Sequence, residues 1–411
     1  MQLTKIRKQF PALMQEVAGK SPVFLDGPGG SQVPQSVLTA MSAYLGRYNS
    51  NLGGAFFSSH QTVDLVNKAR ESAATLLNAP SKEQIVFGPN MTSLTFSFSR
   101  AISRDWQAGD EIIVTNADHF SNVSSWQQAA DDKGVKVHAL EVDTADCSLD
   151  LVQLKSLLNE NTKLVAVTYA SNTTGTINDI KAIVDMAHQV GALVYVDAVH
   201  YAPHMLVDVQ ALDCDFLACS AYKFFGPHLG MVYGKREHLE GFTPYKVEPA
   251  TDLIPGRWET GTQSFEAMAG FIQAVEYIAS LSELAESEPL RTRLEVAFTN
   301  AKQHEDALSK YFLERIAKYK SVTLYGISDL SRLAERTPTF AITIAGVTPR
   351  QVSEHLGKEH ICVWDGNFYA KGLCQQLNVL DNGGVIRIGC MHYNTIEELE
   401  RFFDVLEPLL A

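Results

Sequence analysis

Residues 192–234 read ALVYVDAVHYAPHMLVDVQALDCDFLACSAYKFFGPHLGMVYG. Within this stretch the runs ALVYVD, DFLACS and LGMVYG are short and apolar, and polar segments separate them, which predicts three buried strands. The first run ends at Asp197, and two residues separate the end of the second from Lys223. In open α/β sheets, ligands bind beyond the carboxyl ends of the strands, so we expect Asp197 and Lys223 to lie in a ligand site.

The same pattern extends toward the N-terminus. Strand-like runs begin at Glu111 (EIIVT), Val135 (VKVHALE) and Lys163 (KLVAVTY), and amphipathic stretches separate them. The clearest helix is predicted for residues 179–190, where the apolar side chains share one face. Strands that alternate with helices form βαβ units. The sequence therefore predicts an α/β fold with a mainly parallel sheet covered by helices.

The last third of the chain has a different pattern. Long helices are predicted for residues 265–286 and 290–319, followed by strands at 340–344 and 385–389 and a final helix from Thr395. This pattern indicates a second, smaller α+β unit. We expect three parts: an N-terminal segment (1–20) that packs on either domain, a large α/β domain (21–285) and a small C-terminal α+β domain (286–411).

Composition limits the classes of partner. The chain has 411 residues and a net charge of −13, which argues against binding to nucleic acid or to anionic membranes. No apolar run has the length of a membrane span, and the first residues contain no signal-peptide core. The six cysteines show no metal-ligand spacing. We therefore expect a cytoplasmic protein with reduced thiols and no metal site.

The polar residues beyond the strands indicate one cofactor, pyridoxal 5'-phosphate. This cofactor requires a lysine amine for a Schiff base and a carboxylate that pairs with the pyridinium nitrogen, so that the ring accepts electrons. Lys223 and Asp197 supply these two groups. The run FGPNMTSLTF, residues 87–96, places Thr92 and Ser93 at the expected start of a helix. Hydroxyls and free backbone N–H groups at that position suit a phosphate.

The order of these segments resembles that of the class V aminotransferase superfamily, and within it the cysteine desulfurases. The resemblance runs from Phe24 to the end of the chain and is densest over residues 172–233. RWETGTQ, from Arg257, and IRIGCMHYNTIEEL, from Ile386, extend it into the later chain. It implies fold type I of the pyridoxal-phosphate enzymes, an amino-acid substrate, and a homodimer with its sites at the subunit interface.

The resemblance also implies a role for each candidate residue. Lys223 would hold the cofactor, Asp197 would pair with the pyridinium nitrogen, and His119 would stack on the pyridine ring; these three would be the catalytic residues. Arg387 would bind the α-carboxylate of the substrate, a task that suits the planar guanidinium. The other implied cofactor contacts are Asn172 and His200 at the phenolic oxygen, Thr92, Ser93, Ser220 and Tyr222 at the phosphate, and Thr262 reaching across from the partner subunit.

One loop departs from the desulfurase pattern. Where these relatives carry Arg-Thr-Gly-His-His-Cys, residues 364–369 read WDGNFY, so that Tyr369 stands at the position of the nucleophilic cysteine. A phenol cannot accept a sulfane sulfur as a thiolate does. A shifted loop could instead present Cys374. Tyr369 itself could act as a general acid, a pocket wall or a loop-packing residue.

The sequence thus predicts a pyridoxal-phosphate enzyme in which Lys223, once displaced from the cofactor, removes the α-proton of an amino acid. C–S bond cleavage, by a desulfurase or a C–S lyase, is the first hypothesis, and a sulfur-acceptor protein is expected only for a desulfurase. An aminotransferase and an amino-acid epimerase are alternatives on the same scaffold. A further alternative is a regulatory protein that binds the cofactor without catalysis. The presence of Lys223, Asp197 and Arg387 together argues against that alternative.

Overall fold

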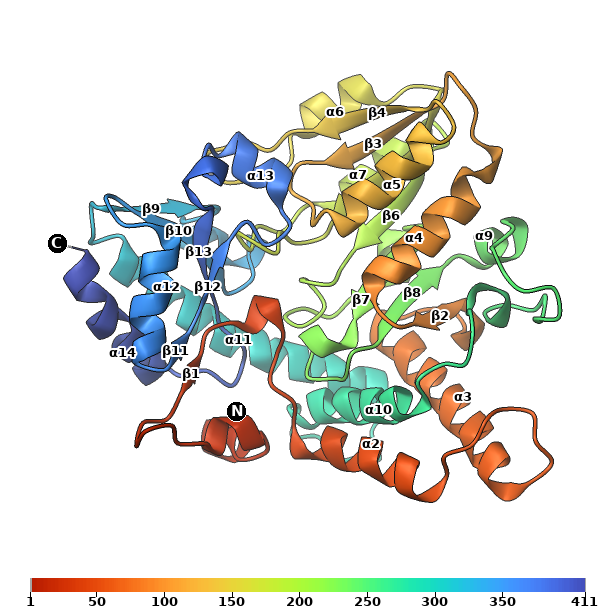
Figure 1. Ribbon diagram of the computed structural model, residues 1–411, viewed down its shortest axis with the longest axis horizontal. Helices are drawn as coiled ribbons and strands as arrows, with labels where there is room; N and C mark the ends of the chain where they lie inside the picture. Colours follow the sequence, from red (N-terminus) through yellow and green to blue (C-terminus); the bar gives the residue numbers. More distant parts are fainter. Residues whose placement is uncertain (1, 411) are drawn as a thin grey trace.

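A seven-stranded sheet forms the right-hand part of the molecule in the computed structural model, which describes residues 2–410 (Figure 1). Its strand order is β2-β8-β7-β6-β5-β3-β4. Five of the strands lie between positions 111 and 220, and each begins and ends within two residues of the corresponding predicted strand. The strands are β2 (Ile85–Gly88), β3 (Glu111–Thr115), β4 (Lys136–Leu140), β5 (Thr162–Thr168), β6 (Leu193–Asp197), β7 (Phe216–Ser220) and β8 (Gly230–Gly234).

Strands β4, β3, β5, β6 and β7 are parallel, and β8 runs antiparallel to both β7 and β2. The reversal follows from the short connection between β7 and β8, which has no room for a crossover helix. Lys223 lies in this connection, just beyond the carboxyl end of β7. A side chain at Gly230, in β8, would collide with the backbone of Asn90. This glycine therefore allows the segment before α4 to pack directly on the β7–β8 hairpin.

Helices cover both faces of the large sheet. In β6, Val194 and Val196 face one apolar layer and Tyr195 faces the other, because side chains alternate along a strand. The Tyr195 layer packs under α4 and α5, where it contains Phe98 and Trp126. The opposite layer packs under α3, α7 and α10. The helices of this part are α2 (Gln35–Arg47), α3 (Phe57–Leu77), α4 (Met91–Ile102), α5 (Ser121–Asp131), α6 (Leu151–Leu157), α7 (Ile180–Gln189), α8 (Val209–Leu212), α9 (Arg236–Gly241) and α10 (Phe265–Ser280).

A four-stranded antiparallel sheet of order β12-β13-β10-β9 forms the left-hand part. It packs against α12, α14 and the second half of α11, where Phe312 stacks on Phe340. Thr395 caps α14 through a capping box with Glu398. The elements of this part are α11 (Leu290–Ile316), β9 (Val322–Tyr325), β10 (Thr339–Ile344), α12 (Pro349–Lys358), β11 (Ile361–Cys362), β12 (Trp364–Gly366), α13 (Lys371–Gln376), β13 (Val385–Gly389) and α14 (Ile396–Leu406).

The N-terminal segment contacts both parts. Helix α1 (Leu3–Arg7) precedes Phe10, which packs in the core of the large part, whereas Arg7 forms an ion pair with Glu398 in α14. Strand β1 (Val23–Phe24) pairs in parallel with β11. Residues beyond position 20 therefore contribute to the core of the small part. The division at residues 20 and 285 stays a prediction.

The structure confirms the predicted α/β class, with a mostly parallel central sheet and a smaller antiparallel sheet. Helix α10 ends at Ser280, before the predicted end at residue 286, and α11 ends at Ile316. Strand β2, a four-residue strand at the edge of the large sheet, was not among the predicted runs. Between residues 2 and 410, no helix is both long and apolar enough to cross a bilayer.

Candidate active site

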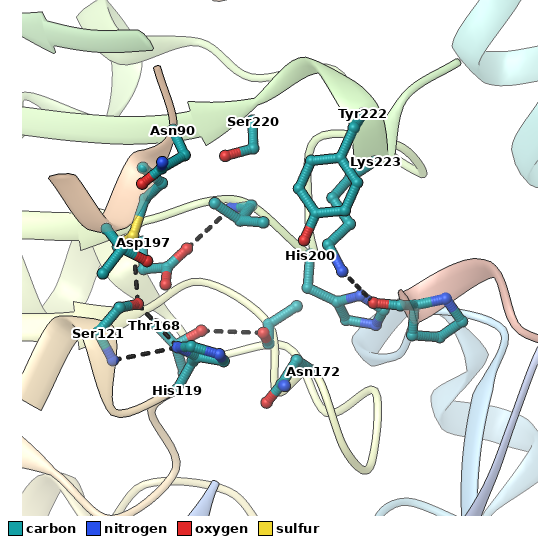
Figure 2. Close-up of a pocket in the computed structure, with 15 residues that line it drawn as sticks. Asn90, His119, Ser121, Thr168, Asn172, Asp197, His200, Ser220, Tyr222 and Lys223 are labelled. Atoms are coloured by element: carbon teal, nitrogen blue, oxygen red, sulfur yellow. Dashed lines mark hydrogen bonds between the residues drawn. The ribbon is translucent and has the colours of Figure 1, made fainter. Parts of the chain in front are cut away.

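A cavity lies at the carboxyl ends of β5, β6 and β7, between the start of α4 and the turn at Pro28 (Figure 2). It encloses about 620 Å³ of space, part of which is open to solvent. Eight of the eleven predicted site residues line it. They are Thr92, His119, Asn172, Asp197, His200, Ser220, Tyr222 and Lys223.

Lys223 ends a single 3-10 turn after β7, and its ammonium group donates a hydrogen bond to the carbonyl oxygen of Pro28. The side chain is almost wholly buried. Burial, and secondarily the nearby Arg387 guanidinium, lowers the pKa of Lys223 to about 7. A substantial fraction of this amine is therefore neutral, and so nucleophilic and basic, at neutral pH.

Asp197 ends β6 and is 5% exposed. Its Oδ1 accepts a hydrogen bond from the backbone N–H of Val199 at 2.9 Å, which orients the carboxylate in the cavity. Burial raises the pKa of Asp197 to about 6, while the positive charge of Lys223 acts in the opposite direction. A cation beside this carboxylate would stabilise its ionised form.

His119 follows β3 and is fixed in one tautomer by Ser121. The backbone N–H of Ser121 donates to His119 Nδ1 at 3.1 Å, so Nδ1 carries a lone pair and the proton of the neutral ring sits on Nε2. Burial, together with the charges of Lys223 and Arg387, lowers the pKa of His119 to about 4. The imidazole is therefore neutral at physiological pH, as a ring that stacks on an aromatic ligand should be.

Three of the four residues predicted to bind the phosphate from within the same chain line the cavity. Thr92 is in the first turn of α4, and Ser220 and Tyr222 flank the end of β7. Ser93 does not line the cavity, because its backbone N–H is bound to the side chain of Asn90 and its side chain faces solvent. Thr262 is likewise exposed and outside the cavity. The roles of Ser93 and Thr262 stay predictions.

Two threonine hydroxyls lie within hydrogen-bond distance of the His200 ring. Its Nε2 lies 3.2 Å from Thr337 Oγ1 and 3.0 Å from Thr339 Oγ1, both on the small part of the molecule. Its Nδ1 is buried and makes no hydrogen bond within the described chain. A buried nitrogen without a partner is costly, so a ligand oxygen in the cavity would stabilise this residue.

Arg387, in β13, lies behind the cavity wall rather than in it. Its Nη1 donates to the carbonyl oxygen of Asn172 at 2.9 Å, and its guanidinium lies 4.0 Å from the centroid of the Phe368 ring. Arg387 is 4% exposed. The Phe368 ring therefore lies against the guanidinium, and the substrate role of Arg387 stays a prediction.

The sequence profile of the Aminotransferase class-V family matches residues 23–402. The chain belongs to this family. It is 33% identical to the aminotransferase-like protein FGM3 of Gibberella zeae (99% of this chain, 98% of that protein), and 31% identical to a cysteine desulfurase of Pectobacterium carotovorum (99% and 98%).

Solved structures of cysteine desulfurases are similar to the whole chain. The enzyme from Thermococcus onnurineus NA1 superposes with a TM-score of 0.87 at 25% identity, covering 99% of this chain and 98% of that one. CsdA from Escherichia coli gives 0.86 at 26% identity, covering 100% and 98%. The fold is thus fold type I of the pyridoxal-phosphate enzymes, as the resemblance implied, and this class-V aminotransferase family member is an enzyme.

No cysteine lines the cavity of this family member among residues 2–410. Cys374 lies inside α13, fully buried in an apolar cluster with Ala341 and Val385. Burial raises the pKa of the Cys374 thiol to about 11, so it is a protonated core residue rather than a nucleophile. The hypothesis that a shifted loop presents Cys374 is inconsistent with this position. Tyr369 is 71% exposed and packs against His119.

Two features of the class-V site were not predicted. Asp26 is mostly buried, its Oδ1 has no partner within residues 2–410, and burial raises its pKa to about 6 despite the charges of Arg387 and Lys223. Pro28 contributes a cavity wall and the carbonyl oxygen that binds Lys223. Both belong to the run LDGPGG, residues 25–30. Its acidic residue after a short apolar run was the available signal.

Proposed function

We propose that this chain is a pyridoxal-phosphate-dependent enzyme that removes the α-proton of an amino acid and cleaves a C–S bond in it. The observation that carries the proposal is the buried pair of Lys223 and Asp197, whose pKa values are shifted toward neutrality in one cavity. Its support also includes the family and the relatives named cysteine desulfurase. Perturbed titratable groups that converge in a cavity mark catalytic sites.

The groups around the cavity fit pyridoxal phosphate. The hydroxyls of Thr92, Ser220 and Tyr222, with the N-terminus of α4, would hold the phosphate. Asp197 would pair with the ring nitrogen. The buried Nδ1 of His200, which lacks a partner in the described chain, suits the phenolic oxygen together with Asn172. The neutral ring of His119 is suited to stacking.

When bound, the cofactor supplies an electron sink that stabilises negative charge on the α-carbon of the substrate. Lys223 Nζ, with its lowered pKa, accepts the α-proton as a general base. Asp197 would stabilise a positive charge at the ring nitrogen through its buried carboxylate. Both side chains are buried, which strengthens their electrostatic effects.

The substrate end of the site favours elimination over sulfur transfer to the protein. Transfer would need a thiolate in reach of the cavity, and the described residues provide none there. Elimination needs no protein nucleophile: L-cysteine and water would give pyruvate, ammonia and hydrogen sulfide. We therefore propose a C–S lyase rather than a persulfide-forming desulfurase, so that no sulfur-acceptor protein is required.

A second candidate is an aminotransferase. The relative at 33% identity is named aminotransferase-like, and a cavity free of cysteine suits transfer of an amine equally well. For either reaction we propose a cytoplasmic homodimer in which Thr262 of one subunit completes the phosphate site of the other. The exposed position of Thr262, outside the cavity of its own chain, supports this arrangement.

The test is an absorption titration of purified protein with L-cysteine, L-cystine and a panel of other amino acids. Wild type and Lys223→Ala are compared, and sulfide, persulfide, pyruvate and alanine are quantified. A visible band that is lost in Lys223→Ala, with sulfide and pyruvate from wild type, is expected for a C–S lyase. Alanine with protein-bound persulfide would contradict the proposed elimination. No band and no response to any amino acid would overturn the whole proposal.

A further inference from the structure

The loop after β12 is held in an unfavourable backbone conformation. Phe368 and Tyr369 have φ angles of 52° and 60°, so two successive residues with side chains lie in the left-handed region. This conformation is costly for non-glycine residues and persists only where surrounding contacts hold it. The same segment lies against the candidate active site.

Contacts from the large part of the molecule hold the loop. The backbone N–H of Phe120 donates to the carbonyl oxygen of Tyr369 at 2.8 Å, and Asn172 Nδ2 donates to the carbonyl oxygen of Phe368 at 3.0 Å. Within the loop, the backbone N–H of Ala370 donates to the carbonyl oxygen of Asn367 at 2.7 Å. The loop is thus attached to two residues that adjoin the cavity, although it belongs to the small part of the molecule.

These contacts place the Phe368 ring over the Arg387 guanidinium at 4.0 Å. Arg387 is buried, and no carboxylate within residues 2–410 forms an ion pair with it. Its Nε has no hydrogen-bond partner within the same residues, and its Nη1 binds only the carbonyl oxygen of Asn172. A buried cation normally requires an anion. Burial lowers the pKa of Arg387, whereas Asp26 is near enough to raise it without forming an ion pair, and the negative face of the aromatic ring partly replaces an ion-pair partner.

We propose that Phe368 is a displaceable cap on Arg387, and that an α-carboxylate of the substrate moves it aside on binding. An anion interacts with a buried guanidinium more strongly than a ring does, so a carboxylate displaces the ring. The cost of moving the ring lowers the affinity of the site for the carboxylate. The cap rests on the carboxylate-binding role of Arg387 in the proposed function, and it makes Phe368 a residue that sets the affinity for the carboxylate.

The first test measures how accessible Arg387 is to a chemical reagent when no substrate is present. Phenylglyoxal modifies accessible arginines, and peptide mass spectrometry gives the rate at each one. Phe368→Ala should raise the modification rate of Arg387 by about 3- to 30-fold, the equilibrium equivalent of a cation–π contact. Arg336 is the internal control, since it is also buried and lies 4.5 Å from the Phe340 ring. Tyr369→Ala should leave Arg387 protected, because Tyr369 does not contact it.

The second test measures carboxylate binding by calorimetry on the purified holoenzyme with propionate, which has no amine to react with the cofactor. Phe368→Ala should bind propionate about 3- to 30-fold more tightly than wild type. Phe368→Leu keeps an apolar side chain without the ring face, so its affinity for propionate should lie between those of the other two proteins. It provides a second measurement if the alanine variant folds poorly. Arg387→Gln should lose propionate binding.

The two tests separate the proposals. If propionate binds equally well to Arg387→Gln, the carboxylate-binding role of Arg387 is wrong. If binding depends on Arg387 but neither the leucine nor the alanine variant changes affinity or modification rate, the cap is wrong and Phe368 is only a packing residue. A faster modification of Arg336 in the same variants would show general loosening of the fold and would also overturn the cap.

Discussion

The rings of His119 and Tyr369 pack against each other with their centroids 5.1 Å apart and an angle of 31° between their planes. His119 comes from the large part of the molecule and Tyr369 from the loop after β12. The phenol oxygen of Tyr369 makes no hydrogen bond with a described residue, and the side chain is largely exposed. This contact indicates a packing role for Tyr369, not an acid–base role.

We therefore expect Tyr369→Phe to retain activity within about 2-fold of wild type, as for other exposed positions whose polar atom has no partner. Tyr369→Ala should instead lower kcat/KM, because His119 loses the ring that packs against it. Steady-state kinetics of both variants on the substrate found in the amino-acid panel checks this. A loss of about 100-fold or more in Tyr369→Phe would identify the phenol as a general acid.

The pKa of Lys223 predicts its chemical reactivity. Only the neutral amine reacts with acylating reagents, and the pKa is lowered to about 7 by burial and by Arg387. In protein freed of cofactor, pulsed acetylation of Lys223 should therefore rise with pH around a midpoint near 7 and level off above it. Peptide mass spectrometry follows the reaction, with the exposed Lys310 as a reference for the reagent. A rise that continues unchanged through pH 9 would contradict the lowered pKa.

Asp197→Asn should separate catalysis from stability. Asparagine Oδ1 can still accept the hydrogen bond from Val199, so the free energy of unfolding should change by less than about 1 kcal/mol. The charge at the ring nitrogen is lost, and we expect kcat/KM to fall by at least about 100-fold, or ~2.7 kcal/mol in activation free energy. Thermal unfolding and kinetics of the same preparation check the two parts. An active Asp197→Asn enzyme would exclude the assigned role.

Cys374→Ala should leave turnover unchanged, because the thiol is a buried, protonated core group. The variant should lose about 1 kcal/mol of stability, since removing a small buried atom leaves a cavity in the cluster with Ala341 and Val385. Sulfide release and urea unfolding of wild type and variant provide the measurement. Loss of sulfide release with unchanged stability would restore Cys374 as a nucleophile.

The predicted dimer can be tested by mixing inactive subunits. If Thr262 acts across the interface, Lys223→Ala and a Thr262→Val variant impaired in cofactor binding should form mixed dimers with one intact site. Random exchange would then restore about a quarter of the wild-type activity. Sedimentation should show a species with the mass of two chains. Restored activity with Lys223→Ala and Asp197→Asn would not be expected, since both residues serve the same chain's site.

Much of the fold and the cofactor end of the site could be predicted from the sequence, because local pattern determines both. Each strand run is continuous, and Asp197, Ser220 and Lys223 follow strand ends directly, so topology alone brings them together. The predicted helix start before Thr92 was correct for the same reason.

The substrate end could not be predicted, because it depends on contacts between distant segments. The ring of Phe368 covers Arg387 only because Phe120 and Asn172 hold the loop in a left-handed conformation. No local pattern indicates that contact. Strand β1 was missed because two residues that pair with β11 show no periodicity.

The pairing of Val23 with Ile361 has a consequence for how the protein is made. On the ribosome, all seven strands of the large sheet are synthesised before β11. Strand β1, and with it the nearby Pro28 carbonyl that binds Lys223, therefore has no strand to pair with until synthesis is nearly complete. The ion pair of Arg7 with Glu398 forms later still, because Glu398 is synthesised 391 positions after Arg7. Contacts between such distant segments form late in folding. A nascent chain released before position 361 would therefore expose the apolar side of β1. Its Lys223 pocket would be incomplete and accessible to chaperones and proteases.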